Sequence, residues 1–459
     1  MMSVHLQEGL FELCANRIKK DDEFQAIVSN KNFDEITYDL FQEYKLFQLQ
    51  RTVKHVYENS KFYRNKLNEL SIKPEDIKSL EDISKLQFTF PNDLRSEGQN
   101  FQFLCTSQRD VEKPVTFHSS GTTGIKKRIY FSKKDVQKIL DFLPRGMETV
   151  EDRDKCCAQI FLPNGEGRGI AAMLASGLMS FGMRACISDM STSAEDAIKV
   201  CKENKSNVWF GDAFTIYRVT KQMAKKIDLS SLGVKVLFLT MGNISSPMKE
   251  YLEKTWNCRV STHYGLTEMG WGLAVDCDIC DGYHYNELDV IAEVVDPETG
   301  ELLPEGEIGE LVLTSIARDA MPLIRFRTGD ISALEKPECG YDLEVMKHIV
   351  SRLEGSYQLP GGTKINPPIL EEAIFNVEEI VDYQAFMKED RLYLKVETVD
   401  LDEWGVDEVK VKEQLIEEIL QLEAFKNSHE PSIELLEPNS LKPFVYEKKR
   451  ILHFEKIER

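Results

Sequence analysis

The stretch from residue 118 to residue 130 carries residue types that suit phosphate binding. It reads His-Ser-Ser-Gly-Thr-Thr-Gly-Ile-Lys-Lys-Arg-Ile-Tyr, with two glycines among four hydroxyl residues and three cations close behind. Such a loop can bend sharply and bring backbone N–H groups and hydroxyls onto phosphate oxygens. It is not a Walker loop, because only two residues separate Gly121 from Gly124 where that motif needs four. We therefore predict a phosphate loop of another kind; the alternative is a surface turn rich in Ser and Thr.

Two later motifs offer groups that suit the rest of a nucleotide. Tyr264-Gly-Leu-Thr-Glu268 combines a ring, a hydroxyl and a carboxylate, which can stack a base and hold a divalent cation. Arg325-Phe-Arg-Thr-Gly-Asp330 ends in a carboxylate that can accept two ribose hydroxyls. Taken alone, the first motif more often marks a strand end, and the second a salt-bridged turn. The first follows a strand expected at 234–240 and a helix expected at 247–256, which is where α/β sheets bind ligands.

A compact set of metal-binding residue types lies further along the chain. Cys277-Asp-Ile-Cys280 is followed by His284, and Cys339 lies in a later turn. Three thiols and an imidazole form a tetrahedral set typical of structural zinc. The alternative is four unrelated side chains, since cysteine is commonly just buried. We predict a zinc ion that pins the strand-rich part of the fold and takes no part in chemistry.

These motifs need a framework to position them, and the sequence predicts an α/β one. The first hundred residues have helical periodicity, and strands alternate with helices from about 115 to 265. Short alternating runs from about 285 to 350 predict a strand-rich lobe. We therefore expect a large N-terminal domain, 1–352, with mostly parallel sheets flanked by helices, followed by a small mobile α+β domain, 353–459. A glycine-rich stretch at 351–362 is the expected hinge.

Individual elements follow from apolar runs and helical spacing. Strands are expected at 155–162, 208–211, 234–240, 289–295, 309–314, 330–334, 383–387 and 392–397. Helices are expected at 193–203, 247–256, 368–377 and 407–422, and another is expected to start at 73–76 with its proline near the first turn.

The composition is that of an ordinary globular protein. With 459 residues, 42% hydrophobic and 29% charged, the chain can bury a large core. Its net charge of -20 argues against a nucleic-acid partner, because phosphate contacts need clustered Lys and Arg. We see no signal-peptide pattern, and the most apolar segment, 169–183, is too short to span a bilayer. Ten cysteines without a secretion signal predict reduced thiols and a cytoplasmic location.

Taken together, the motifs resemble those of the adenylate-forming superfamily of acyl-CoA synthetases, adenylation domains and luciferases. The stretch at 118–130 is similar to that family's Ser/Thr-Ser-Gly-Thr-Thr-Gly-x-Pro-Lys, with Lys126 where Pro is usual. The next two match its Tyr-Gly-x-Thr-Glu and Arg-Thr-Gly-Asp. Residues 349–355 resemble its Gly-Arg-x-Asp hinge, with Ser351 in place of Gly and Glu354 as the hinge acid. The four motifs also stand in the family's order and spacing, so the resemblance spans nearly the whole chain.

The branch that the chain resembles is the phenylacetate–coenzyme A ligase group, together with luciferase-associated acyl-protein synthetases. The stretches that carry this resemblance are His55-Val-Tyr-Glu-Asn-Ser-Lys-Phe-Tyr-Arg64, Gly309-Glu-Leu-Val-Leu-Thr314 and Pro322-Leu-Ile-Arg-Phe-Arg-Thr-Gly-Asp330. The resemblance implies a ligase that uses ATP and Mg2+ to convert a carboxylic acid, for example an aromatic one, into acyl-AMP and then passes the acyl group to coenzyme A. Two alternatives stay open: transfer to a carrier-protein or enzyme thiol, and a nucleotide-binding relative with impaired adenylation. A homodimer is implied by resemblance alone.

The resemblance also assigns roles within the nucleotide site. The β- and γ-phosphates would be cradled by Ser119, Ser120, Gly121, Thr122, Thr123 and Gly124, with Lys126 or Lys127 nearby. Thr267 would contact the α-phosphate, and Glu268 would hold Mg2+ together with Thr122. Adenine would stack on Tyr264, next to Gly265, and be edged by Gly242 and Asn243. Asp330 would take the ribose, assisted by Arg352.

The family's C-terminal catalytic lysine has no plain counterpart. The family pattern is Gly-Lys-x-x-Arg, whereas residues 441–451 read Leu-Lys-Pro-Phe-Val-Tyr-Glu-Lys-Lys-Arg-Ile. Anchoring on Arg450 places Glu447 at the lysine position, and a slip of one residue offers Lys448. Lys448 is the catalytic candidate; a different residue, weak adenylation or a solvated basic run are the alternatives.

An acyl pocket of aromatic size is expected from Phe161, Trp209, Phe210 and Phe214. Asp212 can meet a substrate amine or hydroxyl, and His263 can face the substrate carboxylate. For each of these residues the alternative is ordinary packing or a solvated loop position.

Overall fold

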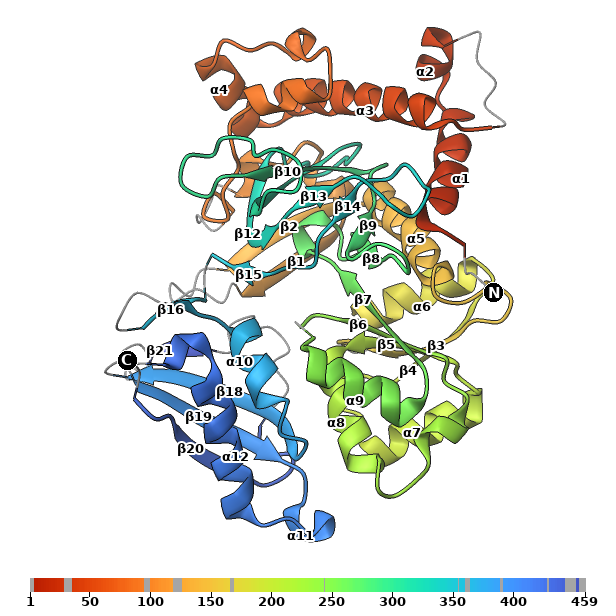
Figure 1. Ribbon diagram of the computed structural model, residues 1–459. Coiled ribbons are helices and arrows are strands. Elements are labelled where there is room, and N and C mark those ends of the chain that lie inside the picture. Colours follow the sequence, from red (N-terminus) through yellow and green to blue (C-terminus); the bar gives the residue numbers. More distant parts are fainter. Residues whose placement is uncertain are drawn as a thin grey trace. The chain divides into compact units, whose positions relative to one another are not determined.

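The computed structural model describes residues 4–28, 35–94, 100–118, 126–165, 169–242, 244–353, 355–359, 364–388, 391–426, 429–441 and 451–453. The chain forms two compact units. The first comprises Met1–Ser119, Thr123–Asp152 and His263–His348, and the second comprises Ser120–Thr122, Arg153–Thr262 and Ile349–Arg459. The N-terminal helices and a strand-rich lobe belong to the first unit, and a parallel sheet and the C-terminal region belong to the second (Figure 1). Within the described ranges, no helix has the length and apolar character needed to cross a membrane.

Helices open the first unit: α1 (Leu6–Ile18), α2 (Asp22–Ile27), α3 (Tyr38–Asn59) and α4 (Lys61–Glu69). α3 begins at Thr37, whose hydroxyl accepts a hydrogen bond from Leu40 N, and its buried residues recur at helical spacing. The helix expected to start at 73–76 is only a 3-10 turn, η1 (Pro74–Asp76). The chain turns away there because the Asp82 carboxylate accepts hydrogen bonds from the next two free backbone N–H groups, of Lys78 and Ser79, at 2.7 and 3.0 Å.

A hairpin frames the predicted phosphate loop. β1 (Val111–His118) and β2 (Lys126–Ser132) pair antiparallel with His118 opposite Lys126, so the two strand ends that flank the predicted loop in the sequence lie side by side. α5 (Lys133–Glu148) follows at once and begins with a capping box between Ser132 and Asp135. Three further 3-10 turns complete this part of the chain: η2 (Glu81–Lys85), η3 (Asn100–Gln102) and η4 (Gln108–Asp110).

The strand-rich lobe forms as expected. Its strands are β8 (Ala274–Asp276), β9 (Tyr283–Tyr285), β10 (Val290–Val295), β11 (Gly309–Ser315), β12 (Phe326–Ser332), β13 (Leu334–Glu335) and β14 (Val345–Met346). β10, β11 and β12 pair antiparallel in chain order, with Val290 opposite Ser315 and Gly309 opposite Ser332. β8, β9, β14 and β13 form a second antiparallel run.

The parallel sheet of the second unit confirms the predicted α/β fold class. β3 (Cys157–Phe161), β4 (Arg184–Ile187), β5 (Val208–Asp212), β6 (Val236–Thr240) and β7 (Arg259–Tyr264) pair in the order β4-β3-β5-β6-β7. The connections are α6 (Ile170–Ser180), α7 (Ala194–Asn204), α8 (Ala213–Met223), η5 (Leu229–Leu232) and α9 (Ser246–Trp256). α7, α8 and α9 cover one face of this sheet (Figure 1). β7 runs on into the first unit, where Tyr264 pairs with Ala274 of β8 and η6 (Thr267–Met269) follows.

The C-terminal region is an α+β arrangement. It contains β15 (Ser351–Arg352), β16 (Tyr357–Gln358), β17 (Lys364–Ile365), α10 (Pro367–Ile374), β18 (Ile380–Lys388), β19 (Arg391–Thr398), α11 (Leu401–Trp404), α12 (Glu408–Gln421), η7 (Glu423–Phe425), β20 (Ser432–Leu436) and β21 (Ile451–His453). Its sheet has the order β20-β19-β18-β21. The Phe375 ring lies 5.7 Å from that of Phe214 and 5.5 Å from that of Tyr217, so this region shares an apolar core with α8. The domain boundary at 352/353 and the mobility of the C-terminal domain stay predictions.

Candidate functional site

Tyr264 and Asp330 meet although 66 positions separate them in the chain. The Tyr264 hydroxyl donates a hydrogen bond to Asp330 Oδ2 at 2.6 Å, and Asp330 has no exposed surface. The backbone N–H of Asp330 donates to Thr328 Oγ1 at 3.0 Å, which fixes the strand around the carboxylate. Two of the predicted nucleotide motifs, one at the end of β7 and one in β12, are therefore joined by a short, buried hydroxyl–carboxylate hydrogen bond.

Lys127 and Glu268 form a second buried pair in the same unit. Lys127 Nζ lies 3.0 Å from Glu268 Oε1, and the two side chains are 10% and 6% exposed. Lys127 stands in β2, directly after the predicted phosphate loop, and Glu268 stands in η6. Lys127 Nζ also lies 5.8 Å from the centre of the Phe326 ring in β12. The cation that follows the loop is therefore placed against the carboxylate predicted to hold Mg2+.

The turn that carries Glu268 is tightly built. A Cβ at Gly265 would lie 1.6 Å from the Trp271 carbonyl oxygen, so only glycine fits there. Trp271 N donates to Leu266 O at 2.8 Å and closes the turn, and Gly270 has a φ of +95°. Thr267 opens η6 and is half-buried. Its contact with the α-phosphate stays a prediction.

His263 lies directly before Tyr264 in β7. Burial lowers its pKa to about 4, although the nearby Asp276 carboxylate acts to raise it. The imidazole is therefore neutral at neutral pH. A neutral ring can exchange a hydrogen bond with a substrate carboxylate but cannot neutralise its charge. That His263 faces the substrate stays a prediction.

The aromatic residues expected in an acyl pocket pack against other rings. In the second unit the Phe161 ring lies 4.7 Å from that of Trp209, which lies 4.6 Å from that of Trp256. Phe161 and Trp209 are completely buried in the core that these rings form with α7–α9. Phe210 packs against Phe238 at 5.1 Å. Phe161 and Trp209 are thus core residues in the structure, which is the alternative to a place in the acyl pocket.

Asp212 and Gly242 also have structural partners within the second unit. Asp212 Oδ2 accepts hydrogen bonds from Thr215 N at 2.8 Å and from the Thr215 hydroxyl at 2.7 Å, which caps α8. A Cβ at Gly242 would lie 2.9 Å from the Phe214 ring. The capping role accounts for Asp212 without a substrate. A role in the acyl pocket, or beside adenine for Gly242, stays a prediction.

Several predicted residues cannot be placed. Ser119, Ser120, Gly121, Thr122, Thr123, Gly124, Asn243, Glu354 and Lys448 lie outside the described residues. Arg352 is described in β15 of the second unit, where it is half-buried. Its contact with the ribose or phosphate stays a prediction.

Three of the four predicted zinc residues, Cys277, His284 and Cys339, come together with His5, and Cys280 is not in this cluster. A sulfur of Cys277, a sulfur of Cys339 and one ring nitrogen each of His5 and His284 all lie within 4.8 Å of one another. Cys339 Sγ is 3.4 Å from His284 Nε2 and 3.9 Å from His5 Nε2. Cys280 borders this set, since its backbone N–H donates to Cys277 Sγ at 3.3 Å. His5 was not predicted, because it lies 334 positions from Cys339 and no sequence spacing links them.

Comparison with known proteins finds clear relatives. The family model described as AMP-binding enzyme matches residues 63–317. A phenylacetate–coenzyme A ligase from Pseudomonas putida is 25% identical over 356 residues, which cover 74% of this chain and 77% of the relative. Another from Thermus thermophilus is 27% identical over 363 residues, covering 76% and 80%. The predicted resemblance to this group is confirmed.

Solved structures share the fold. The crystal structure of a 2-hydroxyisobutyryl-CoA ligase in the postadenylation state with 2-HIB-AMP has a TM-score of 0.77 at 19% identity and covers 91% of this chain and 90% of that one. An anthranilate CoA ligase in complex with anthranoyl-AMP has a TM-score of 0.52 at 14% identity, covering 73% and 65%.

Proposed function

Because the chain belongs to the family of AMP-binding enzymes, we propose that it is an acid–thiol ligase that activates a carboxylic acid with ATP. The substrate carboxylate attacks the α-phosphate, pyrophosphate leaves, and the acyl-AMP then loses AMP to a thiol. The observation that carries the proposal is the meeting of three segments in the first unit through the pairs Tyr264–Asp330 and Lys127–Glu268. These pairs join the motifs predicted to bind the base, the ribose, the phosphates and the cation.

The Tyr264–Asp330 pair would hold the nucleoside. The ring of Tyr264 offers a face for adenine, and its hydroxyl keeps the Asp330 carboxylate turned to one side. An ionised carboxylate has acceptor sites left for two ribose hydroxyls. The base and the sugar are thus recognised by two residues that also fix each other.

The Lys127–Glu268 pair would serve the phosphates. The buried Glu268 carboxylate fits Mg2+, a hard cation commonly held by one or two carboxylates and the substrate's phosphate oxygens. When bound, Mg2+ would neutralise phosphate charge. Lys127 adds a positive charge beside Glu268, and a cation in a site closed to water stabilises negative charge more strongly than one in solvent.

The thiol acceptor is proposed to be coenzyme A, and the acid an aromatic one. Support comes from relatives named phenylacetate–coenzyme A ligase, of which this chain covers about three quarters or more. Transfer to a carrier-protein thiol is the second candidate and is separated by offering coenzyme A and a pantetheine-bearing carrier in parallel. The cytoplasmic location and the homodimer stay predictions from sequence and resemblance.

We further propose that the cluster of His5, Cys277, His284 and Cys339 holds a structural zinc ion. Two thiols and two imidazoles within 4.8 Å suit a tetrahedral zinc site. Elemental analysis of protein purified without chelator should find about one zinc per chain, and Cys339→Ser should lose it. Cys258→Ser removes a partly buried cysteine outside the cluster and should keep it. Zinc-free wild-type protein would refute the assignment.

The ligase proposal is tested by hydroxamate formation. Protein is incubated with ATP, Mg2+, hydroxylamine and a panel of aryl, fatty and amino acids, because hydroxylamine captures acyl-AMP whichever thiol follows. We expect product with at least one aromatic acid. No product across the panel would favour the nucleotide-binding relative with impaired adenylation.

A further inference from the structure

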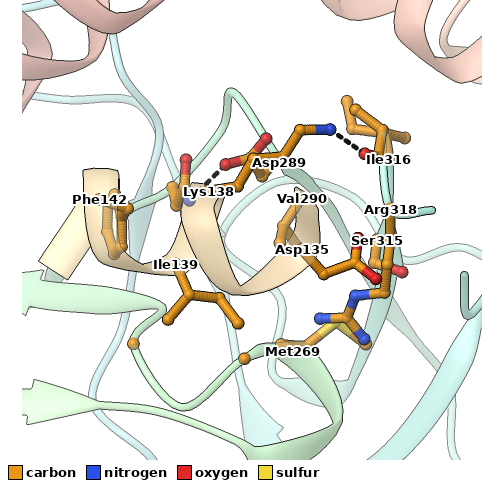
Figure 2. A pocket seen from close by; sticks show the side chains of 14 residues that line it. Asp135, Lys138, Ile139, Phe142, Met269, Asp289, Val290, Ser315, Ile316 and Arg318 are labelled. Carbon is orange, nitrogen blue, oxygen red and sulfur yellow. Dashed lines mark hydrogen bonds between the residues drawn. The ribbon is translucent and has the colours of Figure 1, made fainter. Parts of the chain in front are cut away.

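A small cavity lies behind the turn that carries Glu268. It has a volume of about 40 Å³, and Met269, Gly270 and Gly272 form one wall of it. Charged side chains face it from α5 and from the β11–β12 connection, among them Asp135 and Arg318, which lie beside each other in Figure 2. Beside this cavity the turn packs against α5, since a Cβ at Gly270 would lie 3.0 Å from Ile139 Cγ1 and one at Gly272 would lie 2.5 Å from Leu143 Cδ2.

Arg318 adds a hydrogen bond to this packing. Its Nη1 donates a hydrogen bond to the backbone carbonyl of Glu268, and its guanidinium lies 5.1 Å from the centre of the Phe131 ring. A Cβ at Gly270 would lie 3.6 Å from Arg318 Nη2, so the turn runs close over the guanidinium. Figure 2 shows the side chain extending toward Met269. The guanidinium thus contacts the turn at the Glu268 carbonyl and leaves little room for a side chain at Gly270.

The segment that carries Arg318 is held from two sides. The Asp135 carboxylate accepts hydrogen bonds from the backbone N–H groups of Asp319 at 2.7 Å and Ala320 at 2.9 Å. From α3, Thr52 Oγ1 accepts a hydrogen bond from Ala317 N at 2.8 Å. These bonds anchor the backbone on both sides of Arg318, so its hydrogen bond to the Glu268 carbonyl restrains the turn.

A buried arginine is costly unless its charge and donors are used. Burial lowers the pKa of Arg318, while Asp135, Asp289 and Glu268 act to raise it, and the guanidinium stays charged. A well-packed apolar side chain would fill the same space without that cost. An apolar side chain could reproduce neither the hydrogen bond to the Glu268 carbonyl nor the attraction to these carboxylates.

We propose that Arg318 is a positioning residue that fixes the Glu268 carboxylate for the divalent cation that accompanies ATP, an inference that rests on the proposed function. Arg318 donates a hydrogen bond to the backbone carbonyl of Glu268. Lys127 Nζ lies 3.0 Å from Oε1 of the Glu268 carboxylate. Held at both ends, the carboxylate meets the incoming cation without reorganising. Groups that orient a metal ligand from behind typically contribute about 10- to 100-fold to metal affinity.

The test measures ATP binding by titration calorimetry, with MgCl2 and with EDTA, on the full chain. The readout is the gain in ATP affinity that Mg2+ provides. Arg318→Met should reduce this gain about tenfold while leaving the affinity in EDTA nearly unchanged. Arg318→Lys can still reach the carbonyl but cannot also cover the Phe131 ring, so it should recover part of the gain.

Arg145→Met is the matched control. Arg145 is also a buried arginine that donates to a carbonyl, that of Gly9 at 3.1 Å, but it lies outside the turn. Its loss should lower thermal stability and leave the Mg2+ gain intact. The proposal is overturned if Mg2+ raises the ATP affinity of Arg318→Met as much as that of the wild type. If Arg318→Met fails to fold, a wild-type increase in Arg318→Lys overturns it instead. A wild-type protein without any gain refutes the Mg2+ part of the proposed function instead, and this inference with it.

Discussion

Removing the hydroxyl of Tyr264 should weaken ATP binding without disturbing the ring on which adenine is proposed to stack. Tyr264→Phe keeps the aromatic face and deletes the donor that lies 2.6 Å from Asp330 Oδ2. The substitution therefore separates the orientation of the ribose acceptor from base stacking.

The magnitude follows from the burial of this bond. Asp330 has no exposed surface, so water cannot readily replace the lost donor. A hydrogen bond to a charged group contributes about 1.5–3 kcal/mol. If the loss appears entirely in nucleotide binding, the dissociation constant for ATP rises about 10- to 150-fold. This is an upper bound, because part of the loss destabilises the nucleotide-free protein as well.

Titration calorimetry with ATP measures the effect, and a double-mutant cycle assigns it. Tyr264→Phe and Asp330→Asn are measured singly and together, and the combined loss should be smaller than the sum of the two. The control is Tyr63→Phe, a buried tyrosine of the same unit whose hydroxyl bonds the uncharged Thr89 side chain at 3.0 Å. It should lower stability and leave ATP affinity unchanged. Wild-type ATP affinity in Tyr264→Phe, or strictly additive losses in the cycle, would refute the reasoning.

Two further predictions concern α8 and the C-terminal region within the second unit. Arg218→Met should cost about 3–5 kcal/mol of local stability, because Arg218 bridges the buried carboxylates of Asp382 at 3.0 Å and Glu397 at 3.1 Å. Amide hydrogen exchange in β18 and β19 should therefore accelerate, and unchanged exchange would contradict the prediction. Burial lowers the pKa of Lys221 from 10.5 to about 7, although the Glu378 carboxylate acts to raise it. Between these two pH values the unfolded chain binds more protons than the folded protein. The free energy of unfolding therefore rises with pH there, by up to about 1.4 kcal/mol per pH unit. Lys221→Met should remove that rise and should unfold at a higher temperature than the wild type below pH 7. If melting temperature changes with pH equally in the wild type and in Lys221→Met from pH 7 to 9, the prediction is wrong.

The sequence predicts the framework well where a pattern is local. Strands β5 and β6 lie within short apolar runs, and α9 falls between Ser245 and Asn257, within one residue of the predicted bounds. Short-range spacing also found Cys277 and His284, because their fixed separation is itself a signal. The hairpin of β1 and β2 was missed, although its two strands frame the most informative loop in the chain.

Contacts made only by folding could not be predicted. Arg318 stands in an ordinary-looking loop, and nothing local indicates that it reaches the Glu268 carbonyl. His5 joins the metal cluster from the other end of the chain. For Trp209 the apolar strand predicts burial but not which face of the sheet the ring occupies, and it lies in the core with Trp256.

The central claim is that Glu268 serves adenylation, and pyrophosphate exchange into ATP tests it most directly. With an accepted carboxylic acid and Mg2+, the wild-type protein should exchange label. Glu268→Gln, which keeps the shape of the side chain and removes its charge, should lower the rate about 100-fold or more while the protein stays folded and still binds ATP in EDTA. A folded Glu268→Gln protein that exchanges at the wild-type rate would contradict the account.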